Sequence, residues 1–279
     1  MRPQAMYVGN MLASSLSQQA NLGARLASDT GLQGIETFTA EAGEASGTAA
    51  LRLGYLAIKS GLVESALVVG VEKYTDMVGP EVDAVIAQAA DFDFESTQGL
   101  TPNGLAGMLM QRYLDQYQAP RAAFSVLPLL AHANAVHNPY AMYRKAINQE
   151  AYERAPLVCD PLNLFDVAPY ADGAAAMLLV SDKVLFRSRQ VKPVRIASSA
   201  VAIDALALHD RPDPLAFNAS AQSLRKALQN ANLDWDDVSF FELWDAASIY
   251  GVLTLEACGF AARGEGWRWL RDNDLTPNG

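Results

Sequence analysis

The sequence predicts a layered α/β fold built around a largely parallel sheet. Two patterns carry this prediction: short apolar, strand-like segments alternate with segments of helical periodicity, and glycines stand in the short connections between them. The composition, with 51% hydrophobic and 19% charged residues in a chain of 279, is that of a globular protein. It excludes a disordered, collagen-like or coiled-coil chain.

The alternation is clearest in the first 71 residues. Leu22 and Leu26 share one helical face before Gly31, and Gly61 stands where the glycine after a second helix is expected. In chain order, we expect a strand at Ala5–Met11, a helix at Gln18–Thr30, a strand at Ile35–Thr39, a helix at Ser46–Ser60 and a buried strand at Ala66–Val71.

The stretch from Pro80 to Arg154 has helical patterns with no convincing strand between them. Such an insertion on an α/β core often supplies a substrate-facing surface or a lid. The expected helices are Val82–Ala90, Leu105–Gln116, Ala122–His137 and Tyr140–Asn148.

A second α/β unit is expected after this insertion. A buried strand at Ala174–Val180 and a linker at Arg187–Pro193 precede this unit. Its own elements are a strand at Val194–Ser199, a helix at Leu215–Ala231, a strand at Val238–Leu243 and a helix at Ala246–Cys258. We therefore divide the chain into an N-terminal half, 1–186, with a helical insertion at about 80–154, and a C-terminal half, 190–279.

Charge and cysteine content narrow the class of protein. The net charge of −10 argues against a nucleic-acid binder, which needs a basic surface. No stretch approaches the length of about 20 apolar residues that a membrane span requires. Two cysteines provide neither a disulfide framework nor a zinc site by themselves, so we expect a cytoplasmic protein.

Four motifs then stand in order along the chain. They are EAGEASG at Glu41–Gly47, followed by a helix and a strand ending in GVEKYTDM; NAVHNPYA at Asn134–Ala141; DGAAA at Asp172–Ala176; and ELWDAASIYGVLTLEACGFAARGEG at Glu242–Gly266. Together they resemble the thiolase superfamily, and most closely its sterol-carrier-protein-linked and thiolase-like acetyl-CoA acetyltransferase branches.

The resemblance implies the family's five-layer αβαβα arrangement of two similar α/β halves. It also implies that the family's first strand-helix-strand unit would precede Met1 and that its G-H-P motif would follow Gly279. We therefore expect the chain to be incomplete at both ends relative to that fold.

Two departures from the family affect the chemistry. Glu44 stands where the family has its acyl-accepting cysteine at a helix N-terminus, and Trp244 stands where it has the histidine of E-L-H-D. A carboxylate at a helix start is stabilised by about 0.3–1 kcal/mol, which is sufficient to explain an exposed one. The resemblance instead places Glu44 on the floor of an acyl-CoA pocket, where burial would raise its pKa. There it could remove a proton α to a thioester carbonyl or one from a β-hydroxyl.

Five other residues are candidates for the site. Trp244 can donate one hydrogen bond to a thioester oxygen, although filling volume is the simpler role. His132 is the best acid/base candidate among the three histidines, and its spacing from His137 does not favour a metal pair, so no metal site is expected. Ser46, Asn138 and Tyr250 lie in the matched motifs, and the resemblance implies substrate-binding roles for them.

Three functions remain open. The first is an enzyme of Claisen or retro-aldol type that acts on acyl-CoA without a cysteine nucleophile and without a bound cofactor. The second is an inactive thiolase-like subunit or scaffold that binds acyl-CoA or a small zinc-ribbon/OB-fold partner. The third is ordinary acetyl-CoA acyltransferase activity, against which Glu44 and Trp244 argue. In each case we expect a homodimer or a hetero-oligomer.

Overall fold

A computed structural model of the chain describes residues 2–185 and 192–275. The chain forms two compact units, each assembled from two stretches of sequence. Unit 1 comprises Met1–Ala89 and Tyr170–Ser199, and unit 2 comprises Ala90–Pro169 and Ala200–Gly279. The backbone therefore passes from one unit to the other three times.

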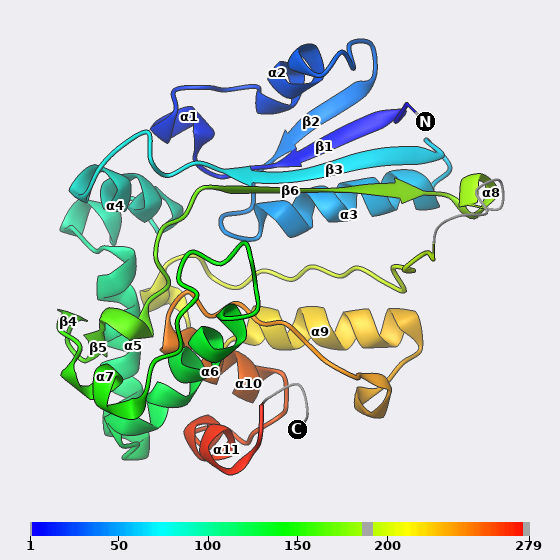
Figure 1. Cartoon of the computed structure of the whole chain (residues 1–279). Helices are drawn as coiled ribbons and strands as arrows, with labels where there is room; N and C mark the ends of the chain where they lie inside the picture. The colour runs from blue at the N-terminus through cyan, green and yellow to red at the C-terminus, as the bar shows by residue number, and fades with distance from the viewer. Residues whose placement is uncertain (1, 186–191, 276–279) are drawn as a thin grey trace. The chain divides into compact units, whose positions relative to one another are not determined.

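Unit 1 is a sheet with helices on both of its faces (Figure 1). Its elements are β1 (Ala5–Gly9), α1 (Ala13–Leu16), α2 (Leu22–Asp29), β2 (Glu36–Ala40), α3 (Ser46–Lys59), β3 (Ser65–Glu72), α4 (Pro80–Ile86), β6 (Gly173–Val180) and α8 (Asp182–Leu185). The strand order is β2-β1-β3-β6. β1 is parallel to both β2 and β3, whereas β6 is antiparallel to β3. The strands expected at Ala5–Met11, Ile35–Thr39, Ala66–Val71 and Ala174–Val180 and the α/β class are confirmed, and the sheet is parallel except at β6.

Alternation of side chains along β1 gives the sheet two apolar faces. Tyr7 points to the face covered by α3, where it belongs to a cluster with Ala50. Val8 points to the opposite face and clusters with Ala27 of α2. Gly61, with φ of +77°, follows the end of α3 as predicted, because a left-handed residue there favours glycine.

Unit 2 is mainly helical. Its elements are α5 (Pro102–Tyr117), α6 (Val126–Ala135), α7 (Gln149–Arg154), β4 (Leu157–Cys159), β5 (Leu162–Asn163), α9 (Asn218–Ala231), α10 (Ser248–Ala257) and α11 (Gly266–Asp272). Its core joins Met110 and Tyr113 of α5 to Ile249 and Leu253 of α10. The insertion and the C-terminal helices thus share one hydrophobic core.

Two expected strands are wrong. Val194–Ser199 and Val238–Leu243 belong to no strand among the described residues, so the second sheet expected from two similar halves is not found there. A strand requires a hydrogen-bonded neighbour, which a local apolar pattern does not supply. Val194 is 96% exposed and Phe240 is 82% exposed, so this pattern does not reflect burial.

The helix expected at Tyr140–Asn148 is also wrong. The segment is irregular, and the next helix, α7, begins only at Gln149. The side chain of Asn148 accepts a hydrogen bond from the Ala151 amide at 2.9 Å and so starts α7 instead of ending the expected helix. Of the expected linker at Arg187–Pro193, residues 187–191 lie outside the described residues.

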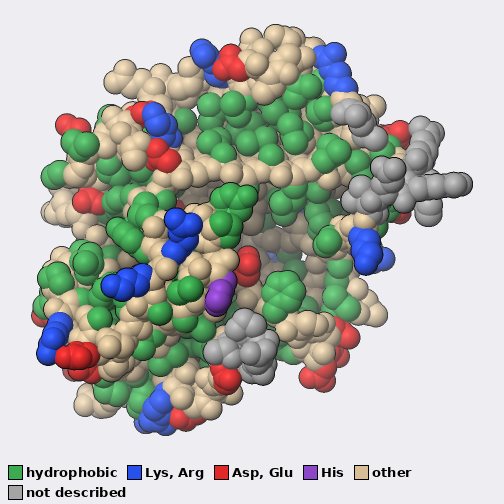
Figure 2. Space-filling model, viewed as in Figure 1, with side chains coloured by type: hydrophobic (Ala, Val, Ile, Leu, Met, Phe, Trp, Pro, Cys, Tyr) green, Lys and Arg blue, Asp and Glu red, His purple; other side chains and the backbone are tan. Residues whose placement is uncertain are grey.

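Both edges of the described sheet of unit 1 carry exposed apolar side chains. Phe38 of the edge strand β2 is 57% exposed, and Met177 and Leu178 of the edge strand β6 are 48% and 49% exposed. Figure 2 shows apolar side chains gathered over the strands of this unit. Open strand edges can pair with a strand of another chain.

Candidate functional site

The first turn of α3 lies directly against the carboxyl ends of β1 and β3. A Cβ added to Gly9 of β1 would lie 2.4 Å from the carbonyl oxygen of Ser46, and one added to Gly70 of β3 would lie 3.8 Å from the Cα atom of Gly47. Glycine at position 9 thus permits the close approach. The carboxyl ends of parallel strands are where ligands bind in open α/β sheets.

Ser46 holds the loop between β2 and α3 in place. It is buried; its hydroxyl accepts a hydrogen bond from the Ala42 amide at 3.0 Å and donates one to the Gly43 carbonyl at 2.5 Å. A β-bridge between Ala42 and Glu44 tightens the same loop. The Ser46 hydroxyl therefore orders the loop that carries Glu44.

Glu44 lies in this loop, two residues before the start of α3, and its side chain is exposed. The burial expected for its carboxylate is therefore not found. Its position near the helix N-terminus still favours a negative charge. The structure thus brings Glu44 and Ser46 together, with Ser46 fixing the backbone and Glu44 facing outward.

A tyrosine cluster, made of Tyr74, Tyr170 and Asp83, belongs to the same unit. The rings of Tyr74 and Tyr170 stack with centroids 5.2 Å apart and an interplanar angle of 18°. The Tyr170 hydroxyl donates a hydrogen bond to Oδ1 of Asp83 at 2.6 Å. The Asp172 carboxylate fixes the backbone of Tyr74, because it accepts a hydrogen bond from the Tyr74 amide at 2.8 Å.

The electrostatics of the cluster connect it to Glu44. Burial and then the charges of Glu72 and Glu44 raise the pKa of Tyr74. Burial, the hydrogen bond to Asp83, the charges of Asp83 and Tyr74 and finally that of Glu44 raise the pKa of Tyr170. The Glu44 carboxylate thus acts on both phenols, and both stay neutral at physiological pH.

Trp244 and Tyr250 come together in unit 2. Their rings stack with centroids 4.5 Å apart and an interplanar angle of 16°. Trp244 is 46% exposed, whereas Tyr250 is 8% exposed and lies in α10. Burial raises the pKa of Asp245, the next residue after Trp244 in the chain. The indole therefore lies on a fixed aromatic surface with one face toward solvent.

His132 and Asn138 lie near the end of α6. The Nδ1 atom of His132 is 2.9 Å from the Lys145 carbonyl oxygen, and its ring packs against Phe165 at 5.4 Å. The side chain of Asn138 accepts a hydrogen bond from the Tyr140 amide at 3.0 Å. Both side chains are thus engaged locally, and the ring partners of His132 do not include Trp244.

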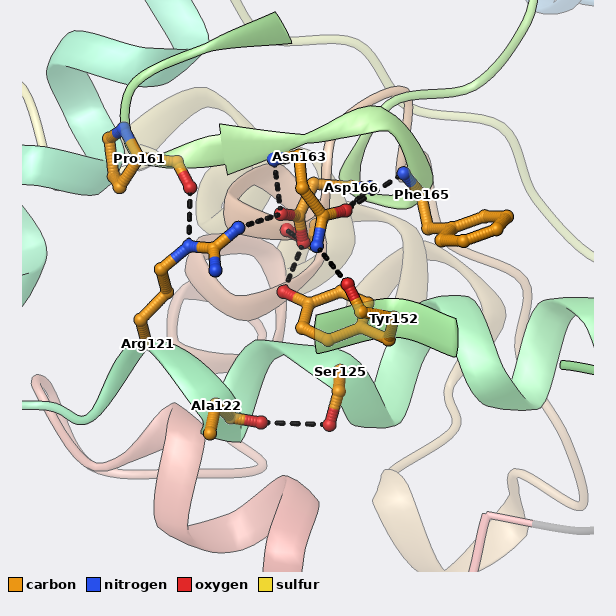
Figure 3. A network of polar contacts seen from close by, with 9 residues as sticks. Arg121, Ala122, Ser125, Tyr152, Pro161, Asn163, Phe165 and Asp166 are labelled. Carbon is orange, nitrogen blue, oxygen red and sulfur yellow. Dashed lines mark hydrogen bonds and ion pairs between the residues drawn. The ribbon is translucent and has the colours of Figure 1, made fainter. Parts of the chain in front are cut away.

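The sequence reasoning missed a buried polar network around Asp166 (Figure 3). The side chain of Asp166 is 0% exposed and lies 4.0 Å from the Arg121 guanidinium. It accepts hydrogen bonds from the Tyr152 hydroxyl at 2.9 Å and from the Ser248 hydroxyl at 2.8 Å. It also accepts one from the Asn163 amide at 2.9 Å, as part of a capping box. The network ties the residues before β6 to the start of α10, and the Asn163-to-Asp166 spacing could have predicted part of it.

The two cysteines, Cys159 and Cys258, both lie in unit 2 and are partly buried. Burial raises the pKa of Cys258 and so favours its unreactive thiol form. In the part of the chain that the structure describes, no three His, Cys, Asp or Glu side chains are placed to bind a metal ion. Over the same residues, no helix has both the length and the apolar character needed to cross a membrane.

Comparison with known proteins places the sequence in a family. The thiolase N-terminal domain matches residues 4–183, and the thiolase C-terminal domain-like family matches residues 200–279. An acetyl-CoA acetyltransferase of Methanothermobacter thermautotrophicus is 37% identical over 96% of this chain and 69% of its own length. The benzoylsuccinyl-CoA thiolase subunit BbsB of Thauera aromatica is 27% identical over 99% of this chain and 70% of its own.

Solved structures give the same fold. The Ltp2-ChsH2(DUF35) aldolase superposes with a TM-score of 0.80 at 21% identity, over 98% of this chain and 70% of that one. A monomeric SCP2-thiolase-like protein of Mycobacterium smegmatis superposes with a TM-score of 0.67 at 18% identity, over 93% of this chain and 54% of that one.

Proposed function

The chain belongs to the thiolase superfamily, and from that membership we propose that it acts on acyl-CoA thioesters without a cysteine nucleophile. The reaction we propose is reversible carbon–carbon cleavage of a β-hydroxyacyl thioester, with coenzyme A thioesters as substrates and no bound cofactor. The observation that carries the proposal is Glu44 beside the first turn of α3, in a unit that contains neither cysteine of the chain.

Glu44 acts as the base at the α carbon in this proposal. In the direction of bond formation its carboxylate removes the α proton of the acyl thioester and leaves an enolate; in cleavage it returns a proton to that carbon. The alternative role of acyl acceptor is disfavoured, because an acyl-glutamate is a mixed anhydride that offers no gain over the thioester. Exposure of Glu44 lets it exchange its proton with water between turnovers.

The remaining candidates have supporting roles. We assign Ser46 to ordering the Glu44 loop, because its hydroxyl both accepts and donates a hydrogen bond within that loop. We assign Trp244 to contact with the acyl group or its thioester oxygen, for which its exposed face on Tyr250 is suited. We propose His132 for proton transfer and Asn138 for substrate binding; the side chains of both also make local hydrogen bonds.

The test uses α-proton exchange, which follows proton removal at the α carbon separately from carbon–carbon cleavage. Acetyl-CoA is incubated with the protein in D2O, and deuterium in the acetyl group is measured by mass spectrometry, beside cleavage of a β-hydroxyacyl-CoA. We expect Glu44→Gln to reduce exchange by roughly 100-fold or more. The matched control is Glu41→Gln, which neutralises an exposed carboxylate of the same loop. Equal exchange by the wild type and Glu44→Gln would refute the base role.

A second candidate function is that of a subunit in a hetero-oligomer. The name of the relative from Thauera aromatica describes a thiolase subunit, and that of the first solved structure describes an aldolase with a DUF35 component. Exposed apolar side chains on β2 and β6 support a partner chain. We propose a small zinc-ribbon/OB-fold protein, or a second copy, as that partner. Acyl-CoA binding without exchange or cleavage would favour this function over the first.

Two further expectations also become proposals. We propose that the halves 1–186 and 190–279 are the two repeats of the family, in support of which the domain matches cover 4–183 and 200–279. We propose the cytoplasm as the compartment, on the support of a chain with two cysteines.

A further inference from the structure

The Tyr170–Asp83 pair lies at the end of the unit 1 sheet where Glu44 lies. β6 begins at Gly173, which is paired with Glu72, the last residue of β3. Tyr170 precedes β6 by three residues and therefore lies near the carboxyl end of β3. The first turn of α3 packs against Gly70 near that same strand end. Glu44, Asp83 and Tyr170, which are far apart in the sequence, thus lie at the same end of the unit 1 sheet.

The orientation of the Tyr170 hydroxyl defines what it can do. It donates its proton to Oδ1 of Asp83 at 2.6 Å, so the lone pairs of the phenol oxygen are left to accept. The stacked Tyr74 ring, 5.2 Å away, holds the Tyr170 ring in this orientation. Asp83 sits in the first turn of α4, where a carboxylate is favoured.

We propose that Tyr170 and Asp83 form a proton relay for the hydroxyl group of the substrate; this inference rests on the carbon–carbon cleavage proposed above. The substrate β-hydroxyl gives its proton to the Tyr170 oxygen while the Tyr170 proton moves to the Asp83 carboxylate. The bond between the α and β carbons breaks, the β carbon becomes a carbonyl, and the electron pair forms the thioester enolate.

The proton balance then closes through Glu44. The enolate takes a proton that Glu44 transfers to it from water and becomes the acyl thioester product. Asp83 returns its proton to water, and Glu44 takes one up, so no external oxidant or reductant is required. Asp83, through Tyr170, therefore accepts the proton of the substrate hydroxyl, and Glu44 supplies the proton at the α carbon.

A second tyrosine–carboxylate pair in the same unit provides a matched control. The Tyr7 hydroxyl donates to Oε1 of Glu36, also at 2.6 Å. Glu36 is the first residue of β2, at the opposite end of the strand from the Glu44 loop. Tyr7→Phe removes the same hydroxyl from the same kind of hydrogen bond, away from the proposed site.

The experiment measures two rates on each variant of the full chain: cleavage of a β-hydroxyacyl-CoA, and α-proton exchange of acetyl-CoA. Tyr170→Phe and Asp83→Asn are expected to slow cleavage by roughly 100-fold or more and to leave exchange unchanged. The double variant should be no slower than either single variant, because the two residues act as one relay. Tyr7→Phe should retain both rates.

Each other outcome overturns the relay. If Tyr170→Phe retains cleavage, the hydroxyl is not on the proton path, and the role of Glu44 still stands. If Tyr170→Phe loses exchange together with cleavage, Tyr170 supports the structure of the Glu44 site instead. If the wild type catalyses neither rate, both the relay and the proposed function are refuted.

Discussion

Replacement of Asp166 by Asn should destabilise unit 2 by about 3–5 kcal/mol. The change keeps the size of the side chain but puts an amide N–H₂ group where one carboxylate oxygen now accepts a hydrogen bond from the Asn163 amide. A buried N–H left unpaired in this way costs about 1–3 kcal/mol. The hydrogen bonds from Tyr152 and Ser248 lose their charged acceptor, which weakens each by about 1 kcal/mol. These contributions together give the range stated.

Tryptophan fluorescence follows the unfolding of unit 2, to which Asp166 belongs, and so measures this loss of stability. All four tryptophans of the chain, from Trp235 to Trp269, belong to unit 2. At a urea slope of about 2 kcal/mol per molar, the loss corresponds to a midpoint lower by about 1.5–2.5 M. The matched control is Glu150→Gln, which makes the same chemical change in an exposed ion pair with Arg154. It should shift the stability by about 0.5 kcal/mol or less.

The reasoning is refuted if Asp166→Asn and Glu150→Gln unfold at the same urea concentration. Such a result would mean that the buried carboxylate contributes no more than an exposed one. Tyr152→Phe supplies an intermediate step, because it removes one donor and leaves the carboxylate with two others. Its midpoint should fall between those of the two other variants.

Three further predictions concern the rest of the chain. Intact-mass analysis after incubation with acetoacetyl-CoA should find no acyl adduct; an adduct mapped to Cys159 or Cys258 would contradict the absence of a cysteine nucleophile. Light scattering should give a mass above the 30.0 kDa of one chain, because β2 and β6 leave open edges, and a stable monomer at high concentration would argue against it. Gly9→Ala should destabilise unit 1 by about 1–3 kcal/mol in a circular-dichroism melt, since its Cβ would meet the Ser46 carbonyl, whereas Gly47→Ala, with open space at its Cβ, should not.

Elements with local causes were predictable from the sequence. The ends of α2 and α3 follow from the glycines behind them, and β1 and β3 follow from apolar runs of strand length. Pairing is not local, and this explains the failures. Nothing within Val238–Leu243 indicates whether a neighbouring strand exists, and nothing within Gly173–Val180 gives its direction against β3.

The candidate site divides in the same way. Glu44 was identified from a motif, but its exposure depends on surroundings that no motif contains. The tyrosine cluster had no sequence signal, because the antiparallel pairing of β3 with β6 is what brings Tyr74 and Tyr170 together. Asp166 had a partial signal in its spacing from Asn163, whereas its bond to Ser248 crosses from one sequence half to the other.

The three crossings of the backbone between the units affect how the protein is made. β3 can pair with β6 only after all of Ala90–Pro169 has been synthesised, so the sheet of unit 1 first exists with three strands. The core around Met110 and Tyr113 of α5 is complete only after Ile249 and Leu253 of α10 have been synthesised. A fragment that ends at the boundary between the sequence halves would contain the sheet, but its α5 helix would expose an apolar face. Separate expression of the two halves would thus divide a hydrophobic core, and only co-expressed halves should yield folded protein.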